Sequence, residues 1–244
     1  MKYSILLLIS FLFLSCSDNQ ITNPKSSPLD EATSGVKNKI YYPSLESNQI
    51  LSIEAFEYGN GQLQKKIYYG DNRDMIYHYE LFNYDNSGKL SYKLNYYNNT
   101  NSPTGFILLD STIYLYSNDL LMTEITNYLY ANYFDKYSYE YDGEILIKKS
   151  KYDNDELESY ITYEYKNGKL SKEINHYKNN TIVETREYSY KNIVLTKVVY
   201  YDSRGNVKRI ISYGYNNKGK LIWEKVDELF IYSSSLPYVV RYVY

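Results

Sequence analysis

The stretch Tyr163-Glu164-Tyr165-Lys166-Asn167-Gly168-Lys169-Leu170 contains the pattern that decides the fold. Two aromatic residues stand two positions apart, an Asn-Gly pair follows them, and a leucine comes after the turn. Residues two positions apart face the same side of a β-strand, so Tyr163 and Tyr165 share a face. Asn-Gly favours a tight hairpin turn because glycine adopts a positive φ at little cost. The stretch therefore predicts two antiparallel strands joined by a short turn.

The same pattern recurs along most of the chain. Its aromatic-x-Tyr pairs are Phe56/Tyr58, Phe82/Tyr84, Tyr114/Tyr116, Tyr139/Tyr141, Tyr163/Tyr165, Tyr188/Tyr190 and Tyr213/Tyr215, with a partial copy at Tyr242/Tyr244. The leucines that follow the full pairs are Leu63, Leu90, Leu121, Leu146, Leu170, Leu195 and Leu221. A second turn sequence, such as Arg204-Gly205-Asn206, follows the leucine strand, so one repeat comprises two strands and two turns.

These repeats predict an all-β fold. Seven two-stranded repeats of about 25 residues give an antiparallel meander of about fourteen strands. We expect a curved or spiralling sheet, with partial closure as an open alternative. Almost no helix is expected, because no window of the sequence shows a sustained helical period.

The composition excludes several classes of protein. Tyrosine accounts for 35 of the 244 residues, and the chain contains one cysteine and two histidines. A single cysteine rules out a disulfide framework and a zinc site built from cysteines, and two histidines argue against a histidine-rich metal site. The net charge of −2 provides no basic field for nucleic acid, and no glycine-rich loop leads into a helix to bind a nucleotide. We therefore expect neither a nucleic-acid partner nor a cofactor.

Strict alternation along the strands predicts one apolar face and one charged face. The aromatic-x-Tyr residues share the first face, and the residues between them, Glu57, Glu140, Glu164 and Ser189, lie on the second. After the turn, the leucine is expected to share its face with the residue four positions later: Ile67, Leu94, Ile125, Ile174 and Val199. The alternate face would then carry Lys66, Lys93, Glu124, Lys149, Glu173 and Glu224. We expect the tyrosine face to be covered and the charged face to be exposed, which argues against a barrel surrounded by lipid.

The N-terminus resembles a bacterial lipoprotein signal. An apolar run from Ser4 to Leu14 is too short to span a bilayer, and Phe13-Leu14-Ser15-Cys16 resembles a lipobox, with Phe13 standing where an aliphatic residue is usual. The resemblance implies removal of residues 1–15 as a signal peptide and lipidation of Cys16, which would anchor the protein to a membrane. An ordinary secretory signal with an incidental cysteine is the alternative.

The remainder of the chain divides into two parts. Residues 16–48 are rich in Ser, Asn and Pro and predict a flexible tether, and residues 49–244 form the β-repeat domain. Ser17-Asp18 resembles the start that sends lipoproteins of Bacteroidetes to the cell surface. This resemblance implies an outer membrane lipoprotein, with the cell surface favoured over the periplasmic face. Asp110-Ser111-Thr112 resembles a short O-glycan acceptor of that phylum, which makes Ser111 a candidate for O-glycosylation, although an ordinary strand serine explains it equally well.

The repeat itself resembles two known classes. Tyr84-Asp85-Asn86-Ser87-Gly88-Lys89-Leu90 and Tyr215-Asn216-Asn217-Lys218-Gly219-Lys220-Leu221 resemble the tyrosine-aspartate (YD) repeats of the RHS family. Tyr165-Lys166-Asn167-Gly168-Lys169-Leu170-Ser171-Lys172-Glu173 also resembles the MORN-related variant repeat of many Bacteroidetes lipoproteins. Both resemblances cover residues 50–244 and imply stacked β-hairpins without implying a chemistry. The chain lacks the regular second glycine of the MORN type and any toxin domain of the RHS type.

Few residues offer chemistry. Trp223, the only tryptophan, is assigned to the leucine face, where it either packs in the sheet or provides a platform for a ligand such as a sugar. His78 and His176 are interpreted as polar strand residues. The turn Asp153-Asn154-Asp155-Glu156 offers oxygen ligands for calcium but lacks the spacing of a dedicated loop. We therefore expect no metal site and no catalytic residue.

These observations favour a lipid-anchored module of the cell envelope that has no catalytic activity and binds a glycan or an envelope protein. Extended repeat arrays commonly bind along their length. One alternative is a structural envelope protein that pairs through an exposed sheet edge, such as residues 238–244. The other is a polysaccharide hydrolase, which needs two carboxylates about 5–10 Å apart in a groove.

Overall fold

The computed structural model describes residues 36–44, 46–70, 75–99, 105–228 and 238–244, and in this part of the chain it contains sixteen strands and no helix. The strands are β1 (Asn38–Tyr42), β2 (Ser52–Gly59), β3 (Gln62–Tyr69), β4 (Ile76–Tyr84), β5 (Leu90–Asn98), β6 (Phe106–Ser117), β7 (Leu120–Tyr128), β8 (Phe134–Asp142), β9 (Ile145–Asp153), β10 (Glu156–Lys166), β11 (Lys169–Tyr177), β12 (Ile182–Lys191), β13 (Val194–Asp202), β14 (Val207–Tyr215), β15 (Leu221–Glu228) and β16 (Tyr238–Val243).

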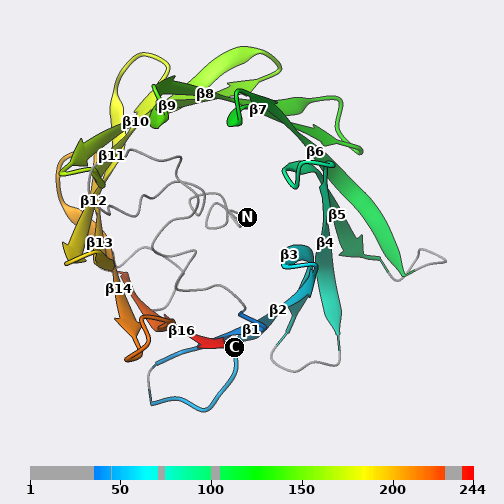
Figure 1. Ribbon diagram of the computed structural model, residues 1–244, viewed down its shortest axis with the longest axis vertical. Coiled ribbons are helices and arrows are strands. Elements are labelled where there is room, and N and C mark those ends of the chain that lie inside the picture. The colour runs from blue at the N-terminus through cyan, green and yellow to red at the C-terminus, as the bar shows by residue number, and fades with distance from the viewer. Residues whose placement is uncertain (1–35, 45, 71–74, 100–104, 229–237) are drawn as a thin grey trace.

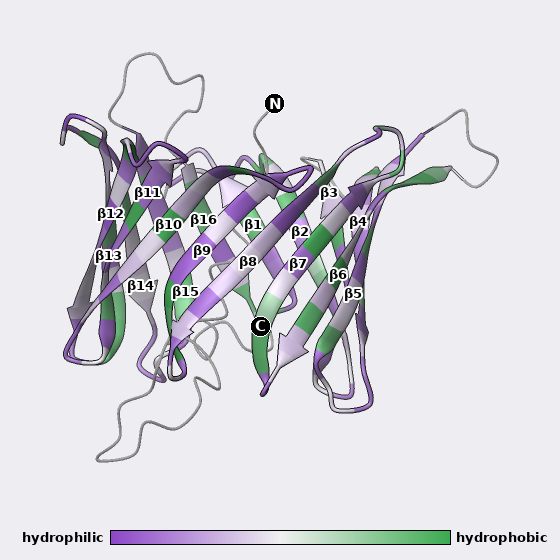
Figure 2. Ribbon diagram, turned by 90° about the horizontal axis from the view of Figure 1, so that it is seen from above, coloured by the Kyte–Doolittle hydropathy of each residue, from purple (hydrophilic) through white to green (hydrophobic). Residues whose placement is uncertain are grey.

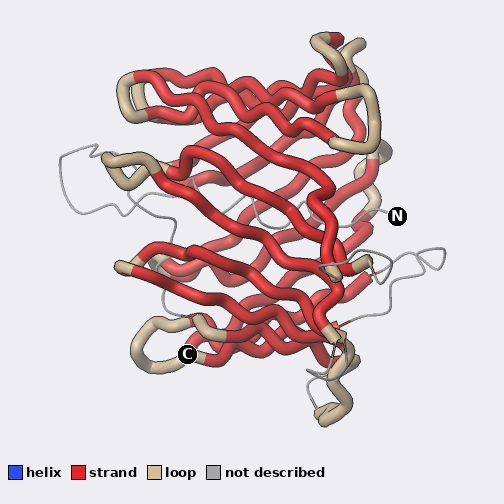
Figure 3. The backbone as a smooth tube through the Cα atoms, turned by 90° about the vertical axis from the view of Figure 1, so that its right-hand side faces the viewer, coloured by secondary structure: helices blue, strands red, loops and turns tan. Residues whose placement is uncertain are grey.

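Each strand pairs antiparallel with its neighbours in sequence, and β1 pairs with β16, so the sheet closes into a barrel (Figure 1). The predicted all-β meander is confirmed, but the predicted spiral is wrong because the sheet closes. Figure 3 shows the connecting turns gathered at the two ends of the barrel. No helix in the described part of the chain is long and apolar enough to cross a membrane.

The barrel contains two strands more than the seven repeats supply. The seven full repeats form the hairpins from β2/β3 to β14/β15, and the partial eighth copy forms β16. The missing partner of β16 is β1, where Lys39 lies opposite Tyr242 on one side and Glu54 on the other. Residues 38–42, assigned above to the tether, are therefore part of the barrel. The edge predicted at residues 238–244 is not available for pairing, because β16 is hydrogen-bonded to both β15 and β1.

The turns follow the predicted chemistry. Asn167 and Gly168 both adopt positive φ (53° and 72°), as a two-residue hairpin turn requires. A longer turn occurs at Asp85, whose Oδ1 accepts hydrogen bonds from the backbone N–H groups of Ser87 and Lys89. The same arrangement occurs at Asp202 and at Asn216. The side chain at the start of these turns thus holds the turn closed.

A β-bulge follows the leucine in each of the seven full repeats. In β10/β11, Tyr165 lies opposite Leu170 but Glu164 lies opposite Lys172, which leaves Ser171 as an extra residue. The extra residues of the seven repeats are Gln64, Ser91, Met122, Ile147, Ser171, Thr196 and Ile222. A bulge inserts one extra residue into the strand. Every residue after the bulge therefore lies on the face opposite to the one that strict alternation predicts.

The bulges overturn part of the predicted face assignment. One face of the barrel wall is the more deeply buried, and we call it the inner wall and the opposite face the outer wall. The tyrosines of the aromatic-x-Tyr pairs and the repeat leucines lie on the inner wall. The charged residues three positions after these leucines lie there too: Lys66, Lys93, Glu124, Lys149, Glu173 and Glu224. The residues four positions after the leucines lie on the outer wall instead. The residues between the aromatic pairs also lie on the outer wall, as predicted.

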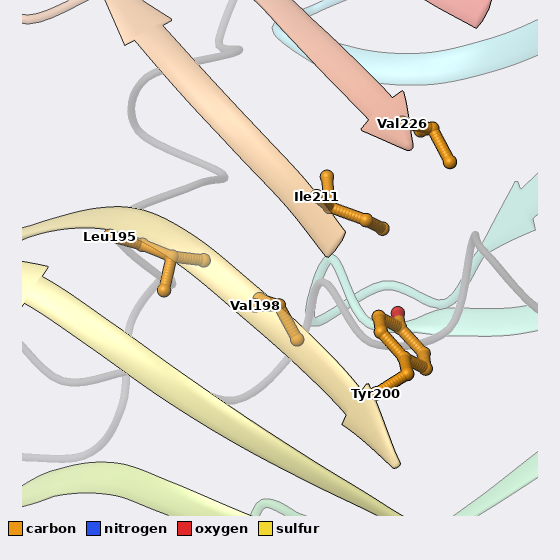
Figure 4. Packing of buried hydrophobic residues seen from close by; sticks show 5 residues of the cluster. All are labelled: Leu195, Val198, Tyr200, Ile211 and Val226. Carbon is orange, nitrogen blue, oxygen red and sulfur yellow. The ribbon is translucent and has the colours of Figure 1, made fainter. Parts of the chain in front are cut away.

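Inner-wall side chains pack into small apolar clusters between the charged positions. Figure 4 shows one of these clusters, formed by Leu195, Val198 and Tyr200 of β13 with Ile211 of β14 and Val226 of β15. These clusters are small, and hydrogen bonds between tyrosines and charged groups link the strands between them.

The outer wall has two sectors of different polarity, and in Figure 2 hydrophobic residues are more frequent along β5 to β7 than along β8 and β9. On β3 to β7 it carries the apolar sector, which consists of Ile67, Tyr79, Leu81, Tyr92, Leu94, Ile113, Leu115 and Ile125. On β8 to β12 it carries the charged sector, which consists of Lys136, Glu140, Lys148, Glu164, Lys172 and Glu187. Charges of opposite sign lie opposite each other here, as in Lys148 and Glu140, which are 2.7 Å apart.

Candidate binding site on the inner wall

At five junctions, the second tyrosine of the aromatic-x-Tyr pair ties its strand to the hairpin before it. Its hydroxyl donates a hydrogen bond to the backbone oxygen of the preceding repeat's leucine. The observed pairs are Tyr84 to Leu63 (2.8 Å), Tyr141 to Leu121 (2.8 Å), Tyr165 to Leu146 (2.9 Å), Tyr215 to Leu195 (2.7 Å) and Tyr244 to Leu221 (2.7 Å). This recurring contact explains why tyrosine and leucine keep a fixed spacing, because the ring must reach one strand pair back along the wall.

A second layer of the inner wall carries buried charges, which we call the inner charged belt. Its members are Lys39, Glu54, Lys66, Glu80, Lys93, Glu124, Lys149, Glu173, Arg186 and Glu224. Lys66 and Glu124 are each only 1% exposed. Buried charges are costly unless they are paired or hydrogen-bonded, so the partners of these groups define what the wall offers to a ligand.

On β2 to β5 the belt consists of ion pairs. Lys66 lies 2.9 Å from Glu54, and Lys93 lies 3.1 Å from Glu80. Burial disfavours the charged form of Glu54, but the neighbouring Lys66 and Lys39 outweigh it and hold the pKa of this carboxyl below its usual value. In both repeats the aromatic residue facing the lysine is phenylalanine, which has no hydroxyl to direct at a cation.

Further around the barrel, buried glutamates accept hydrogen bonds from tyrosines of the following repeat. Tyr139 donates to Glu124 (2.6 Å) and Tyr242 donates to Glu224 (2.8 Å). Tyr188 is likewise hydrogen-bonded to Glu173, which also lies 3.2 Å from Arg186.

Burial outweighs these partners for two of the glutamates. It raises the pKa of Glu224 against the opposing effects of Lys39 and Tyr242. It also raises the pKa of Glu173, although Arg186 opposes the shift. Each of these pairs or triads supplies fixed polar groups on a wall that otherwise consists of aromatic rings and aliphatic side chains.

The residues singled out from the sequence lie elsewhere. Trp223 lies on the outer wall opposite Gly214, not on the leucine face, because the bulge at Ile222 precedes it. A Cβ atom on Gly214 would stand 2.1 Å from the Trp223 ring, so the indole covers a position that only glycine can occupy. This contact supports the packing interpretation of Trp223.

The two predicted modification sites differ in what the structure shows of them. Ser111 lies on the outer wall of β6 opposite Leu94 and Asn127, and its neighbours Asp110 and Thr112 lie buried on the inner wall. Cys16 lies outside the described residues, as do the signal peptide and the tether up to residue 35.

The two histidines lie far apart in the wall. His78 faces inward and stacks on Tyr68 at 3.6 Å, and His176 faces outward and stacks on Tyr160 at 4.6 Å. No arrangement of His, Cys, Asp and Glu in the described ranges could hold a metal ion. In the turn Asp153-Asn154-Asp155-Glu156, whose spacing argues against a calcium site, Asp155 is ion-paired with Lys136.

The polysaccharide hydrolase considered from the sequence needs carboxylates on a shared surface, and the inner wall provides several. The carboxylates on the inner wall in or next to the belt include Glu54, Glu80, Asp110, Glu124, Glu173 and Glu224. Each has a hydrogen-bonding or ion-pairing partner within the wall. Strict alternation placed Glu124, Glu173 and Glu224 on an exposed face. The bulge after each leucine, which moves these residues to the inner wall, was not recognised in the sequence.

The fold and its inner wall define a closed, sixteen-stranded antiparallel barrel with a polar, tyrosine-rich lining. This architecture is similar to that of a porin-like protein from Bacteroides uniformis, with a TM-score of 0.54 and 12% identity over 86% of this chain and 98% of that one. A porin-like protein from Bacteroides vulgatus has 12% identity over the same shares of the two chains and a TM-score of 0.39. No protein family and no curated protein matches the sequence. At this level of identity the likeness shows the fold alone.

Proposed function

We propose that the protein is a non-catalytic barrel of the bacterial cell envelope that binds a polar ligand of the glycan class on its inner wall. A lipid on Cys16 would hold it at the outer membrane, on the cell surface rather than on the periplasmic face. The observation that supports the proposal is the composition of the inner wall, where tyrosine rings alternate with fixed ion pairs and Glu–Tyr hydrogen bonds.

This wall matches the chemistry of a sugar. A tyrosine offers an apolar ring face and a hydroxyl at its edge, so one side chain can stack on a sugar ring and hydrogen-bond to its hydroxyls. Ligand sites generally combine aromatic side chains with a few fixed polar groups. The belt carboxylates are engaged by lysines, Arg186 or tyrosines, and the neighbouring Asp110 is engaged by Asn95. This favours binding over acid–base chemistry.

The outer wall favours a barrel that stays in water. The charged sector on β8 to β12 places Glu140, Lys148, Glu164 and Lys172 within the strands. A lysine facing lipid at the middle of a bilayer costs about 2–4 kcal/mol. A barrel fully surrounded by lipid would therefore bear several such costs at once.

A channel through the outer membrane is the second candidate. Sixteen-stranded barrels are wide enough to leave an aqueous channel in porins, and the apolar sector on β3 to β7 is of a kind that lipid can cover. The two candidates differ in where the barrel lies relative to the bilayer, so membrane fractionation separates them.

The binding proposal is tested by titrating the full-length protein with a panel of neutral and acidic oligosaccharides in a calorimeter. Tyr163→Leu on the inner wall of β10 is expected to weaken binding by about tenfold, because it removes a stacking ring. Tyr160→Leu, on the outer wall of the same strand, is the matched control and should bind like the unaltered protein. Absence of binding to any oligosaccharide, or an equal effect of both substitutions, contradicts the proposal.

A further inference from the structure

Building on the proposed function, we propose that Lys149, together with Tyr137 and Tyr139, forms a subsite for the carboxylate of an acidic sugar. The preferred ligand would then be a glycan that contains uronic acid.

The subsite lies on β8 and β9. Lys149 faces inward between Tyr139 of β8 and Ile161 of β10. Its Nζ lies 4.2 Å from the centre of the Tyr137 ring and 4.9 Å from that of Tyr139. The residue is half-buried, so part of it remains exposed.

The ammonium group of Lys149 has no carboxylate partner within ion-pair distance among the residues that the structure describes. The two carboxylates that most favour its charge, Glu124 and Glu173, are already engaged by Tyr139 at 2.6 Å and by Arg186 at 3.2 Å. Burial lowers the pKa of Lys149 in spite of these two acids. An ammonium group carries three N–H donors, so a ligand carboxylate would supply the acceptors that the protein does not.

The other inner-wall lysines are less available. Lys66 and Lys93 are ion-paired with Glu54 and Glu80, and Lys151 lies 2.6 Å from Glu158. Lys39 lies over the ring of Tyr242, and Val36 packs against the same tyrosine, so the wall next to Lys39 is covered.

The surroundings of Lys149 fit a sugar acid better than a small inorganic anion. Two tyrosine rings flank the ammonium group and provide faces for a sugar ring. The carboxylate of a uronic acid is fixed to its ring, so one residue of such a glycan can occupy both features together. A charge-assisted hydrogen bond of this kind corresponds to about a tenfold or greater change in affinity.

The test is a calorimetric comparison of galacturonic acid oligomers with galactose oligomers of equal length, using the full-length protein. We expect the acidic oligomers to bind about tenfold more tightly. Lys149→Gln should remove this preference, and Lys149→Arg should retain most of it. Lys148→Gln is the matched control, because Lys148 is adjacent in the chain but lies on the outer wall with Glu140.

The outcomes separate this inference from the function on which it rests. Equal binding of both oligomers, or an equal loss of preference in Lys148→Gln and Lys149→Gln, overturns the subsite and leaves the glycan-binding barrel standing. If neither these oligomers nor any of the panel binds, the proposed function fails with it. The thermal unfolding of each variant is measured in parallel, and Lys149→Arg keeps the test decisive if Lys149→Gln does not fold.

Discussion

At the scale of residues, the inner wall matches buried acids with tyrosine donors from the next repeat. Where the position three residues after the leucine is an acid, as in Glu124 and Glu224, a tyrosine of the next repeat donates a hydrogen bond to it. Where it is a lysine, the residue facing it is phenylalanine for Lys66 and Lys93 and Tyr139 for Lys149. A tyrosine of the next repeat thus supplies the donor that each of these buried carboxylates needs.

The raised pKa of Glu224 leads to a prediction about stability and pH. Its folded-state pKa lies above the unfolded-state value because burial disfavours the ionised form. The folded protein therefore holds this proton more tightly than the unfolded chain and loses stability as the pH rises through the window between the two values. Glu224→Gln cannot ionise, and its amide oxygen can still accept the hydrogen bond from Tyr242.

We expect the free energy of unfolding of Glu224→Gln, relative to the unaltered protein, to increase with pH from about 4.5 upward and then to level off. Urea titrations at a series of pH values measure this difference. Glu164→Gln, on the outer wall, serves as the control. A difference that does not change with pH would contradict the account of the buried carboxyl.

At the scale of elements, the bulge after the leucine decides which face each side chain occupies. It allows Leu170 and Glu173, three positions apart, to lie on the same wall, which a regular strand does not allow. It also accounts for where the sequence prediction fails. The extra residues are Gln, Ser, Met, Ile and Thr in different repeats, so no residue type marks the bulge.

The strands, turns and repeats were predictable because their signals are local. Asn-Gly pairs and Asp-initiated turns fix the hairpins, and the aromatic-x-Tyr spacing fixes the pre-turn strands. The buried belt was not predictable in the same way, because strict alternation placed Lys149 and Glu173 on an exposed face. The one available hint was the constant phase of a charged residue after nearly every leucine, which is typical of a structural role and not of a solvated surface.

The bulge in β11 predicts that deleting one residue is tolerated at Ser171 but not at Ile174. Deleting Ser171 removes the extra residue and leaves Leu170 and Glu173 on the inner wall, so we expect a loss of only about 1–2 kcal/mol in the free energy of unfolding. Deleting Ile174 instead moves the end of β11 to the wrong face and should prevent the native barrel from forming. Circular dichroism and urea unfolding measure both effects. Complete loss of folding on deletion of Ser171 would indicate a regular strand at this position.

At the scale of the whole molecule, the decisive feature is closure. The partial repeat at the C-terminus provides β16 without a second strand, and β1 from the N-terminal side of the domain completes it. Closure leaves no sheet edge free, and it gives the repeat array the form of a barrel with distinct inner and outer walls. The partial repeat at Tyr242/Tyr244 indicates that one strand lacks a partner within the repeat array. Residues 38–42 carry no repeat pattern, so the sequence does not identify them as that partner.

The proposed function requires a barrel that stays in water and is held at the membrane only by a lipid on Cys16. The most direct measurement is fractionation of cells that express the Cys16→Ser variant, with the membranes washed in alkaline carbonate. The account predicts that the unaltered protein stays with the outer membrane and that Cys16→Ser appears in the soluble fraction as a folded barrel. Retention of folded Cys16→Ser in the washed membranes, with release only by detergent, would contradict the account and favour a barrel that spans the bilayer.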